Sequence, residues 1–343
     1  MSCCQSTANA STASARHNWT PSQAREIYDL SFLDLVVKAA QVHREHHDAT
    51  EVQVCKLISI KTGACPEDCK YCSQSVRYTT GVEPEPLMEI DEVLKVARRA
   101  KEAGATRVCM GAAWRGPKET TDQGKTDFNK VLDMVRGVNE LGMEVCCTLG
   151  LLSEDQAKRL DDAGLYAYNH NLDTSEAHYG KIITTRKFSD RIQTLNNVRK
   201  TSVTLCSGGI MGMGETVDDR LSMLCTLASF DPHPQSVPIN VLSKVPGTPL
   251  ADAENVPWID IVRMIATARV MMPRSVVRLS AGRANLSASE QAMCFLAGAN
   301  SIFSSENGHM LTLAVPSPDY DADKALLGAL GLSMRPPFKD AAR

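Results

Sequence analysis

The segment VQVCKLISIKTGACPEDCKYCSQS, residues 52–75, joins a strand-like run to a loop that carries three cysteines. Residues 52–60 are rich in branched apolar side chains, which favours a strand. The loop then places Cys65, Cys69 and Cys72 close together. In barrels of alternating strands and helices the active site lies at the C-terminal ends of the strands, so this loop is positioned to carry chemistry.

The same alternation continues along the chain. Strand-like runs lie at 107–113, 144–150, 166–173, 202–210, 236–242, 276–282 and 301–305, and helix-like runs lie at 88–105, 127–141, 153–164, 188–200, 216–230, 256–272, 287–297 and 323–331. The helix at 153–164 opens on Ser153 and closes on Gly164, which are good N- and C-caps. Eight strand–helix units predict an α/β fold of the (β/α)8 TIM-type barrel class. A doubly wound sheet, which also alternates, is the alternative.

No linker rich in Pro, Gly or Ser divides the chain, so we predict a single barrel domain over residues 19–335. A disordered N-terminal tail, 1–18, would precede it, and a C-terminal tail, 336–343, would follow. The first 18 residues lack the apolar centre of a secretory signal. A transit peptide is the alternative to a tail, but the segment has a single arginine.

The composition limits the possible functions. The net charge of −3 gives no electrostatic reason to expect nucleic acid, and no apolar run of about 18 residues predicts a membrane helix. The chain has twelve cysteines and no signal peptide, which predicts a cytoplasmic protein in a reducing compartment. There thiols serve metals or catalysis rather than disulfides.

The loop spacing C-x3-C-x2-C suits three corners of an iron–sulfur cube and leaves the fourth iron open to an exogenous ligand. The alternatives are a zinc site with a distant fourth ligand, or cysteines that are close by chance.

A second set of metal-ligand candidates lies within the strands. Cys109, Cys146 or Cys147, and Cys206 each occupy a strand-like run, and Arg278 has a comparable place in 276–282. Because strand side chains alternate, only one of Cys146 and Cys147 can point into the barrel. We expect the four side chains to converge there; packing cysteines and an ion-paired arginine are the alternative. The remaining cysteines are assigned to packing or to the tail: Cys3, Cys4, Cys55, Cys225 and Cys294.

Two polar segments stand out. The run YNHNLDTS, 168–175, ends a strand with Asn171 and Asp173, which suit the hydroxyls of a ribose; helix capping is the alternative. The run HREHHD, 43–48, spaces three histidines for one helix face, and we interpret it as a solvated face rather than a metal site.

Several segments together resemble the biotin synthase family of the radical S-adenosylmethionine superfamily, from about Trp19 to Phe303. They are SIKTGACPEDCKYCSQS (59–75), CMGAAW (109–114), YNHNLDTS (168–175), CSGGIMGMGET (206–216), VPINVL (237–242), VRLSAGR (277–283) and QAMCFLAGANSIF (291–303). The resemblance implies sulfur insertion into dethiobiotin to form biotin. Another radical enzyme of similar barrel, with rearrangement or lyase chemistry, and a non-catalytic iron–sulfur protein are the alternatives.

The resemblance also implies the cofactors and their ligands. A [4Fe-4S] cluster on Cys65, Cys69 and Cys72 would bind S-adenosylmethionine, and the family pattern G-x-E-x-C-x-T-L-G selects Cys146 over Cys147 for the second site. The second, [2Fe-2S] cluster would have these ligands: Cys109, Cys146, Cys206 and Arg278.

Further roles are implied by the same likeness. S-adenosylmethionine would contact Tyr71, Asn171, Asp173 and Arg191, and dethiobiotin would contact Asn171, Asn240 and Thr312. Thr312 lies in the segment 304–316, which departs from the family pattern and is about two residues longer. The implied partners are an external reductase or flavodoxin/ferredoxin-type electron donor and a second copy of the chain in a homodimer.

Overall fold

The computed structural model describes residues 15–118, 127–306 and 315–337, and within them parallel strands close into a barrel. The barrel strands follow one another in chain order, and the last pairs back with the first. They are β1 (Glu51–Lys61), β2 (Arg107–Ala112), β3 (Glu144–Thr148), β4 (Ala167–Asn169), β5 (Thr204–Cys206), β7 (Ser236–Val241), β8 (Val276–Leu279) and β9 (Ser301–Phe303). The predicted eight-stranded barrel is confirmed, and the doubly wound sheet is wrong.

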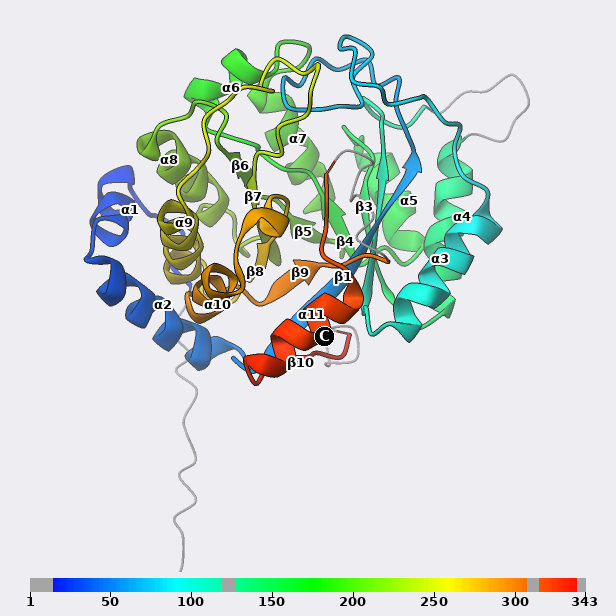
Figure 1. Cartoon of the computed structure of the whole chain (residues 1–343). Helices are drawn as coiled ribbons and strands as arrows, with labels where there is room; N and C mark the ends of the chain where they lie inside the picture. The colour runs from blue at the N-terminus through cyan, green and yellow to red at the C-terminus, as the bar shows by residue number, and fades with distance from the viewer. Residues whose placement is uncertain (1–14, 119–126, 307–314, 338–343) are drawn as a thin grey trace, which may run out of the picture.

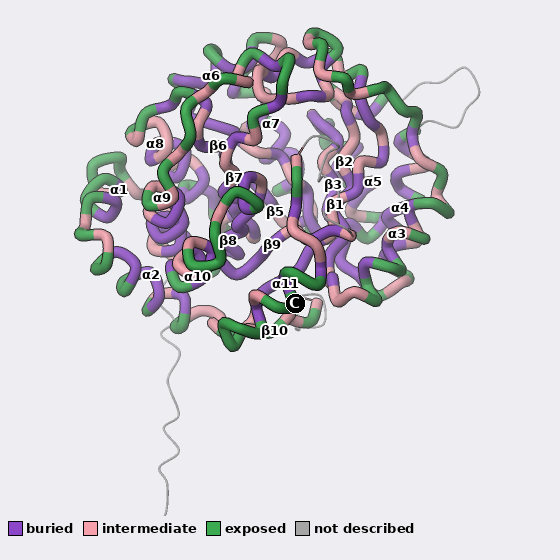
Figure 2. Tube along the Cα trace, viewed as in Figure 1, coloured by how far each residue is buried: buried purple, intermediate pink, exposed green. Residues whose placement is uncertain are grey.

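Helices surround the barrel, and the burial is greatest in the strands and on the inner sides of these helices (Figures 1 and 2). They are α3 (Ile90–Glu102), α4 (Asp127–Glu140), α5 (Glu154–Asp162), α7 (Phe188–Val198), α8 (Val217–Ala228), α9 (Trp258–Met271), α10 (Ala288–Leu296) and α11 (Tyr320–Ala329). Ser153 caps α5 through a capping box with Gln156, and Gly164 follows the helix with φ +86°. Both caps agree with the sequence prediction.

The structure adds elements that the sequence pattern did not predict: α1 (Pro21–Tyr28), α2 (Phe32–His46), α6 (Glu176–Ile182), β6 (Gly209–Met211), β10 (Ser333–Met334) and a 3-10 turn at Arg283–Asn285. The predicted strand 202–210 is divided into β5 and β6 at Gly208. A Cβ at Gly208 would lie 1.9 Å from the carbonyl oxygen of Pro238 on β7, so the close approach of these two backbones requires glycine. No helix of the described ranges has the length and apolar character to span a bilayer.

The barrel interior is filled in layers, and the lowest layer is an ion-pair network. The Nε of Arg107 lies 2.8 Å from Oε2 of Glu144, and the Nε2 of Gln53 donates to the same oxygen over 3.0 Å. Arg107 and Glu144 are the first residues of β2 and β3, Gln53 is the third residue of β1, and all three are fully buried. The next inward positions, two residues further along each strand, are Cys55, Cys109 and Cys146. The layer of cysteines is therefore adjacent to the buried polar layer of Gln53, Arg107 and Glu144, which we call the polar floor.

The predicted terminal tails lie mostly outside the described residues, which begin at 15 and end at 337. The chain contacts the barrel before the predicted domain start at Trp19. His17 Nδ1 lies 2.7 Å from the carbonyl oxygen of Phe230, and the guanidinium of Arg16 lies 4.1 Å from the centre of the Trp19 ring. His17 therefore contacts the segment that follows α8.

The interpretation of HREHHD as a solvated helix face is wrong for His43 and His47. His43 is only 3% exposed, because α2 packs its apolar side against α9. His47 follows α2, and its Nε2 lies 2.9 Å from Nη1 of the buried Arg269. Burial, assisted by the charge of Arg269, lowers the pKa of both histidines to about 3. Both rings are therefore neutral in the folded chain at neutral pH.

The lowered pKa values of His43 and His47 predict that the folded chain loses stability in mild acid. Their folded pKa lies below the ordinary value near 6.5, so their contribution is complete above that value and is lost as the pH falls towards about 3. Each ring can lower the free energy of unfolding by up to about 1.4 kcal/mol per pH unit in that window. We expect His47→Gln to flatten the fall of the melting temperature between about pH 7 and pH 5.

His46→Gln, on the same turn of the chain, is the matched control and should keep the steep profile of the parent protein. Parallel profiles for His47→Gln and the parent protein would contradict the assignment of His47 as a buried neutral ring.

Candidate active site

The three-cysteine loop leaves the C-terminal end of β1 through a tight turn. Gly63 and Ala64 both have positive φ, +65° and +54°, which reverses the chain before Cys65. Cys65 then pairs with the far end of the loop: its N–H donates to the carbonyl of Gln74 over 2.9 Å. The N–H of Cys72 donates to the carbonyl of Cys69, also over 2.9 Å. The folded loop turns all three thiols to one cavity of about 170 Å³.

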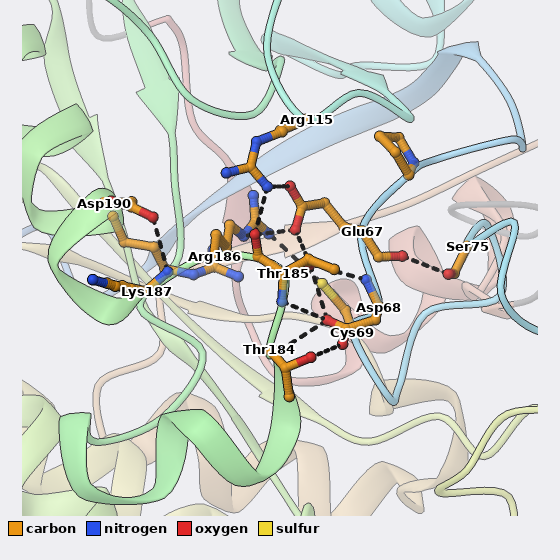
Figure 3. Close-up of polar contacts among 12 residues, drawn as sticks. Glu67, Asp68, Cys69, Ser75, Arg115, Thr184, Thr185, Arg186, Lys187 and Asp190 are labelled. Carbon is orange, nitrogen blue, oxygen red and sulfur yellow. Dashed lines mark hydrogen bonds and ion pairs between the residues drawn. The ribbon is translucent and has the colours of Figure 1, made fainter.

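Two acidic residues of the loop anchor it to the segment after α6 (Figure 3). The carboxylate of Asp68 accepts from the N–H groups of Thr184 and Thr185, over 2.9 and 3.1 Å. Partial burial opposes ionisation of Asp68, but these hydrogen bonds lower its pKa to about 2. Glu67 is buried and accepts from Arg115 over 2.8 Å and from the hydroxyl of Thr185. The loop is thus held in place by Glu67 and Asp68, which are not candidate metal ligands.

Arg186 brings a positive charge to the cysteines. Its Nη2 lies 3.7 Å from Sγ of Cys69, and its Nε lies 3.8 Å from Oε2 of Glu67 (Figure 3). Burial raises the pKa of all three thiols, that of Cys72 to about 12. A buried thiolate therefore needs a cationic partner, and iron supplies one, since a coordinating thiol is deprotonated outright.

The donor set fits the predicted cluster. Three thiols face one cavity beside a guanidinium, which matches the three protein corners of a [4Fe-4S] cube with one open iron. In the described ranges no three His, Cys, Asp or Glu side chains have the geometry of a site for a single metal ion. The fit to a cluster therefore depends on the donor chemistry and on the shared cavity.

The residues expected at S-adenosylmethionine form one network on the wall of the same cavity. Tyr71 donates its hydroxyl to Oδ2 of Asp173 over 2.7 Å, and Arg191 pairs with the same oxygen. Arg191 Nη1 also donates to the carbonyl of Asn171 over 2.5 Å. Asp173 has φ +68°, a strained conformation that this network holds in place.

The sequence of α7 alone would predict that Arg191 is an exposed surface charge, but its side chain is buried, with 3% of the residue exposed. Burial opposes its ionisation, but the Asp173 carboxylate keeps the pKa of the guanidinium above its ordinary value. The two buried side chains of Arg191 and Asp173 therefore pair directly with each other on the wall of the cavity.

A second cavity of about 240 Å³ lies deeper in the barrel. Its lining includes Cys109, Cys146, Asn240 and Arg278. The two cavities share part of their walls, namely Gln74, Ala112, Thr148, Asn169 and Asn171. The outer site and the inner site are therefore neighbours in one interior.

The inner thiols form a buried group apart from the main apolar core, and its cysteines are Cys55, Cys109, Cys146 and Cys206. Cys109 and Cys146 are opposite each other on β2 and β3. Arg278 lies beside this group, with Nη1 3.8 Å from Sγ of Cys206 and Nη2 3.5 Å from Sγ of Cys55. A hydrogen bond from Cys146 lowers the pKa of Cys206 to about 6; burial opposes this shift and Arg278 assists it.

Strand alternation separates the two adjacent cysteines of β3. Cys146 belongs to the inner group, whereas Cys147 packs in the main apolar core between the strands and helices. Cys55, which the sequence analysis assigned to packing, instead belongs to the inner group. The alternation along β1 carried the signal, because Cys55 lies two residues after Gln53, whose side chain faces the barrel interior.

Asn169 and Asn171 belong to the wall that the two cavities share, and Asn240 lines the inner cavity. Asn169 donates to Sγ of Cys206 over 3.1 Å and to Oδ1 of Asn171 over 3.3 Å. Asn240 on β7 accepts from the N–H of Ala281 over 3.2 Å and donates to the carbonyl of Gly209 over 3.0 Å. Asn169 and Arg186 were not predicted as site residues, and Thr312 lies outside the described residues.

Comparisons with known proteins agree with this arrangement. Residues 59–227 match the model of the radical SAM superfamily, and residues 238–333 match that of the biotin and thiamin synthesis associated domain. The biotin synthase of Nostoc punctiforme is 60% identical over 94% of this chain and 95% of its own length. That of Cytophaga hutchinsonii is 55% identical over 95% of this chain and 94% of its own length.

Solved structures support the fold alone. A methylornithine synthase superposes with a TM-score of 0.77 at 18% identity, over 92% of this chain and 94% of that one. An FeFe-hydrogenase maturase from Carboxydothermus hydrogenoformans superposes with a TM-score of 0.76 at 12% identity, over 92% of this chain and 75% of that one. With relatives this similar over nearly its whole length, the chain belongs to the biotin synthase family of radical S-adenosylmethionine enzymes.

Proposed function

We propose that this chain inserts sulfur into dethiobiotin to form biotin, with S-adenosylmethionine as the radical source. The observation that carries the proposal is the wall shared by the two cavities, which includes Asn169 and Asn171. On one side lie the loop cysteines, and on the other lie the inner thiols and Arg278. Hydrogen removal and sulfur delivery would thus take place within one enclosed space.

The outer site would hold a [4Fe-4S] cluster on Cys65, Cys69 and Cys72. When bound, this cluster supplies the electron that cleaves S-adenosylmethionine to methionine and a 5′-deoxyadenosyl radical. The chain's own groups would bind and orient the cofactor: the Asp173 carboxylate can accept from ribose hydroxyls, and the Asn171 amide can donate through Nδ2. Asn171 Oδ1 is engaged by the N–H of Gly208 over 3.1 Å, and its Nδ2 has no partner in the described part of the chain.

The inner site would hold a [2Fe-2S] cluster on Cys109, Cys146, Cys206 and Arg278, whose bridging sulfide is the sulfur source. Support comes from the contact group of these cysteines and from the guanidinium within 4 Å of Cys206. A rearrangement or lyase enzyme would have no need of this set. A non-catalytic iron–sulfur protein would have no need of the polar wall of asparagines.

Asn240 would hold the ureido ring of dethiobiotin. Its two contacts with backbone groups fix the amide plane and leave one N–H for the substrate. The role of Thr312 at the substrate carboxylate stays a prediction, as do the electron donor, the homodimer and the cytoplasmic location.

Removing one loop cysteine tests the outer site and the activity together. The parent protein, reconstituted and reduced without oxygen, should form 5′-deoxyadenosine and biotin from S-adenosylmethionine and dethiobiotin. Cys69→Ala should lose both products to background while the barrel stays folded, because the loop is anchored by Glu67 and Asp68 rather than by the thiols. Product formation is followed by liquid chromatography, and folding by circular dichroism.

Cys225→Ala, on α8 and away from both cavities, is the matched control and should keep both products. Cleavage of S-adenosylmethionine by Cys69→Ala at the parent rate would show that the loop does not carry the cluster.

The two cysteines of β3 test the inner site. We expect Cys146→Ala to lose the visible absorption of the second cluster, because its thiol faces the inner group. Cys147→Ala should keep that absorption and lose only about 1 kcal/mol of stability, as is usual for a small buried truncation. The reverse result, with the cluster lost in Cys147→Ala alone, would contradict the register of β3.

Arg186 tests how the outer cluster is tuned. Arg186→Gln removes the charged donor beside Cys69, and we expect the cluster to assemble with a more negative reduction potential. Activity should fall by about 10–100-fold, as is typical when a group that supports a metal ligand is removed. Arg186→Lys restores the charge without the planar donors and should recover part of the potential.

The potential is read from a redox titration followed by electron paramagnetic resonance. A purely structural Arg186 would lower the amount of cluster in Arg186→Gln while leaving its potential at the parent value.

A further inference from the structure

Strand alternation places Cys55 in the inner group, although it is not among the proposed ligands of the inner cluster. It is completely buried on β1, and its Sγ lies 3.5 Å from Nη2 of Arg278 and 3.7 Å from Oγ of Ser301. The other end of the same guanidinium, Nη1, lies 3.8 Å from Sγ of Cys206. Arg278 therefore stands between two thiols, one of them outside the proposed ligand set.

The inner side chains lie close together. Cys55, Cys109, Cys146 and Cys206 belong to one buried contact group, and Cys109 lies opposite Cys146 on β2 and β3. Arg278 contacts two members of this group, Cys206 and Cys55. A [2Fe-2S] cluster takes four protein ligands, and the four cysteines and Arg278 offer five candidates.

The chemistry of the side chains favours Cys55 over Arg278 as an iron ligand. A guanidinium is almost always protonated and then has no lone pair for a metal. Thiolate is the ordinary ligand of iron–sulfur clusters, and Cys55 lies next to the guanidinium that it would replace. The Nε of Arg278 donates to Ser301 over 3.0 Å, so a released Arg278 has a position that it already occupies in this structure.

We propose that Cys55 is a reserve ligand of the inner cluster, able to take the iron position that Arg278 holds. This inference rests on the proposed function, since it needs an inner cluster. The exchange would conserve charge and protons. Cys55 would bind iron as a thiolate, and its proton would pass to the departing neutral side chain of Arg278. Arg278 would then be a guanidinium beside the Cys55 thiolate.

The exchange can be tested with two single variants and one double variant. Arg278→Met should still assemble an inner cluster, with an absorption spectrum shifted towards that of four-cysteine sites. Cys55→Ala should assemble the inner cluster with Arg278. The double variant Cys55→Ala/Arg278→Met keeps three ligands, and its affinity for inner-cluster iron should fall about 10–100-fold below that of Arg278→Met.

Cys147→Ala/Arg278→Met is the matched control, because Cys147 is equally buried but packs in the outer apolar core. It should keep the inner cluster of Arg278→Met. Iron and sulfide per chain, Mössbauer spectra that separate the two clusters, and melting temperatures are measured for each protein after anaerobic reconstitution.

Three results would overturn the proposal. The first is a folded Arg278→Met that assembles no inner cluster. The second is a double variant that holds as much inner iron as Arg278→Met. The third is an Arg278→Met whose inner cluster has the absorption spectrum of the parent protein. A parent protein that assembles the outer cluster alone would instead overturn the inner site of the proposed function, which is a different outcome from these three.

Discussion

The alternation of side chains along closed parallel strands is the constraint on which this site depends. Once β1, β2 and β3 are in register, every second residue must face the barrel axis. The polar floor of Gln53, Arg107 and Glu144 therefore fixes the layer above it, two residues further along each strand. Strand pairing therefore sets the direction of the side chains of Cys55, Cys109 and Cys146. The inner thiol group results from this pairing and not from the conformation of a loop.

The outer site is built by different means. Its cysteines lie on a loop, where no ladder of hydrogen bonds determines direction, so side chains must hold it. Glu67 and Asp68 do this from positions between the cysteines, by contacts with Arg115, Thr184 and Thr185. Asp173 and Arg191 fix the facing wall in the same way. Charged groups that would be costly alone are buried here as pairs, which makes the cavity rigid and keeps its polarity defined.

Much of this could be predicted from the sequence, because periodicity and cap residues are local signals. The strands, most helices and the ends of α5 at Ser153 and Gly164 followed from such signals. Burial could not be predicted where it depends on distant partners. His43 lies on a helix face that looks polar until α9 covers it, and Arg191 looks exposed until Asp173 is brought to it. Cys55 was missed because one cysteine on a strand is most often a packing residue.

Because Cys146 and Cys147 are adjacent, β3 tolerates a one-residue shift in register better than the other strands that carry inner cysteines. A slip of one residue exchanges the two faces of a strand. On β2 such a slip would turn Val108 or Met110 to the axis in place of Cys109, and on β5 it would turn Leu205 or Ser207 in place of Cys206. On β3 a slip in one direction would replace Cys146 by Cys147, so a sulfur atom would still face the centre. A single-residue deletion just before Cys146 is therefore less damaging in β3 than the same change would be in β2 or β5, because a thiol would still face the inner group.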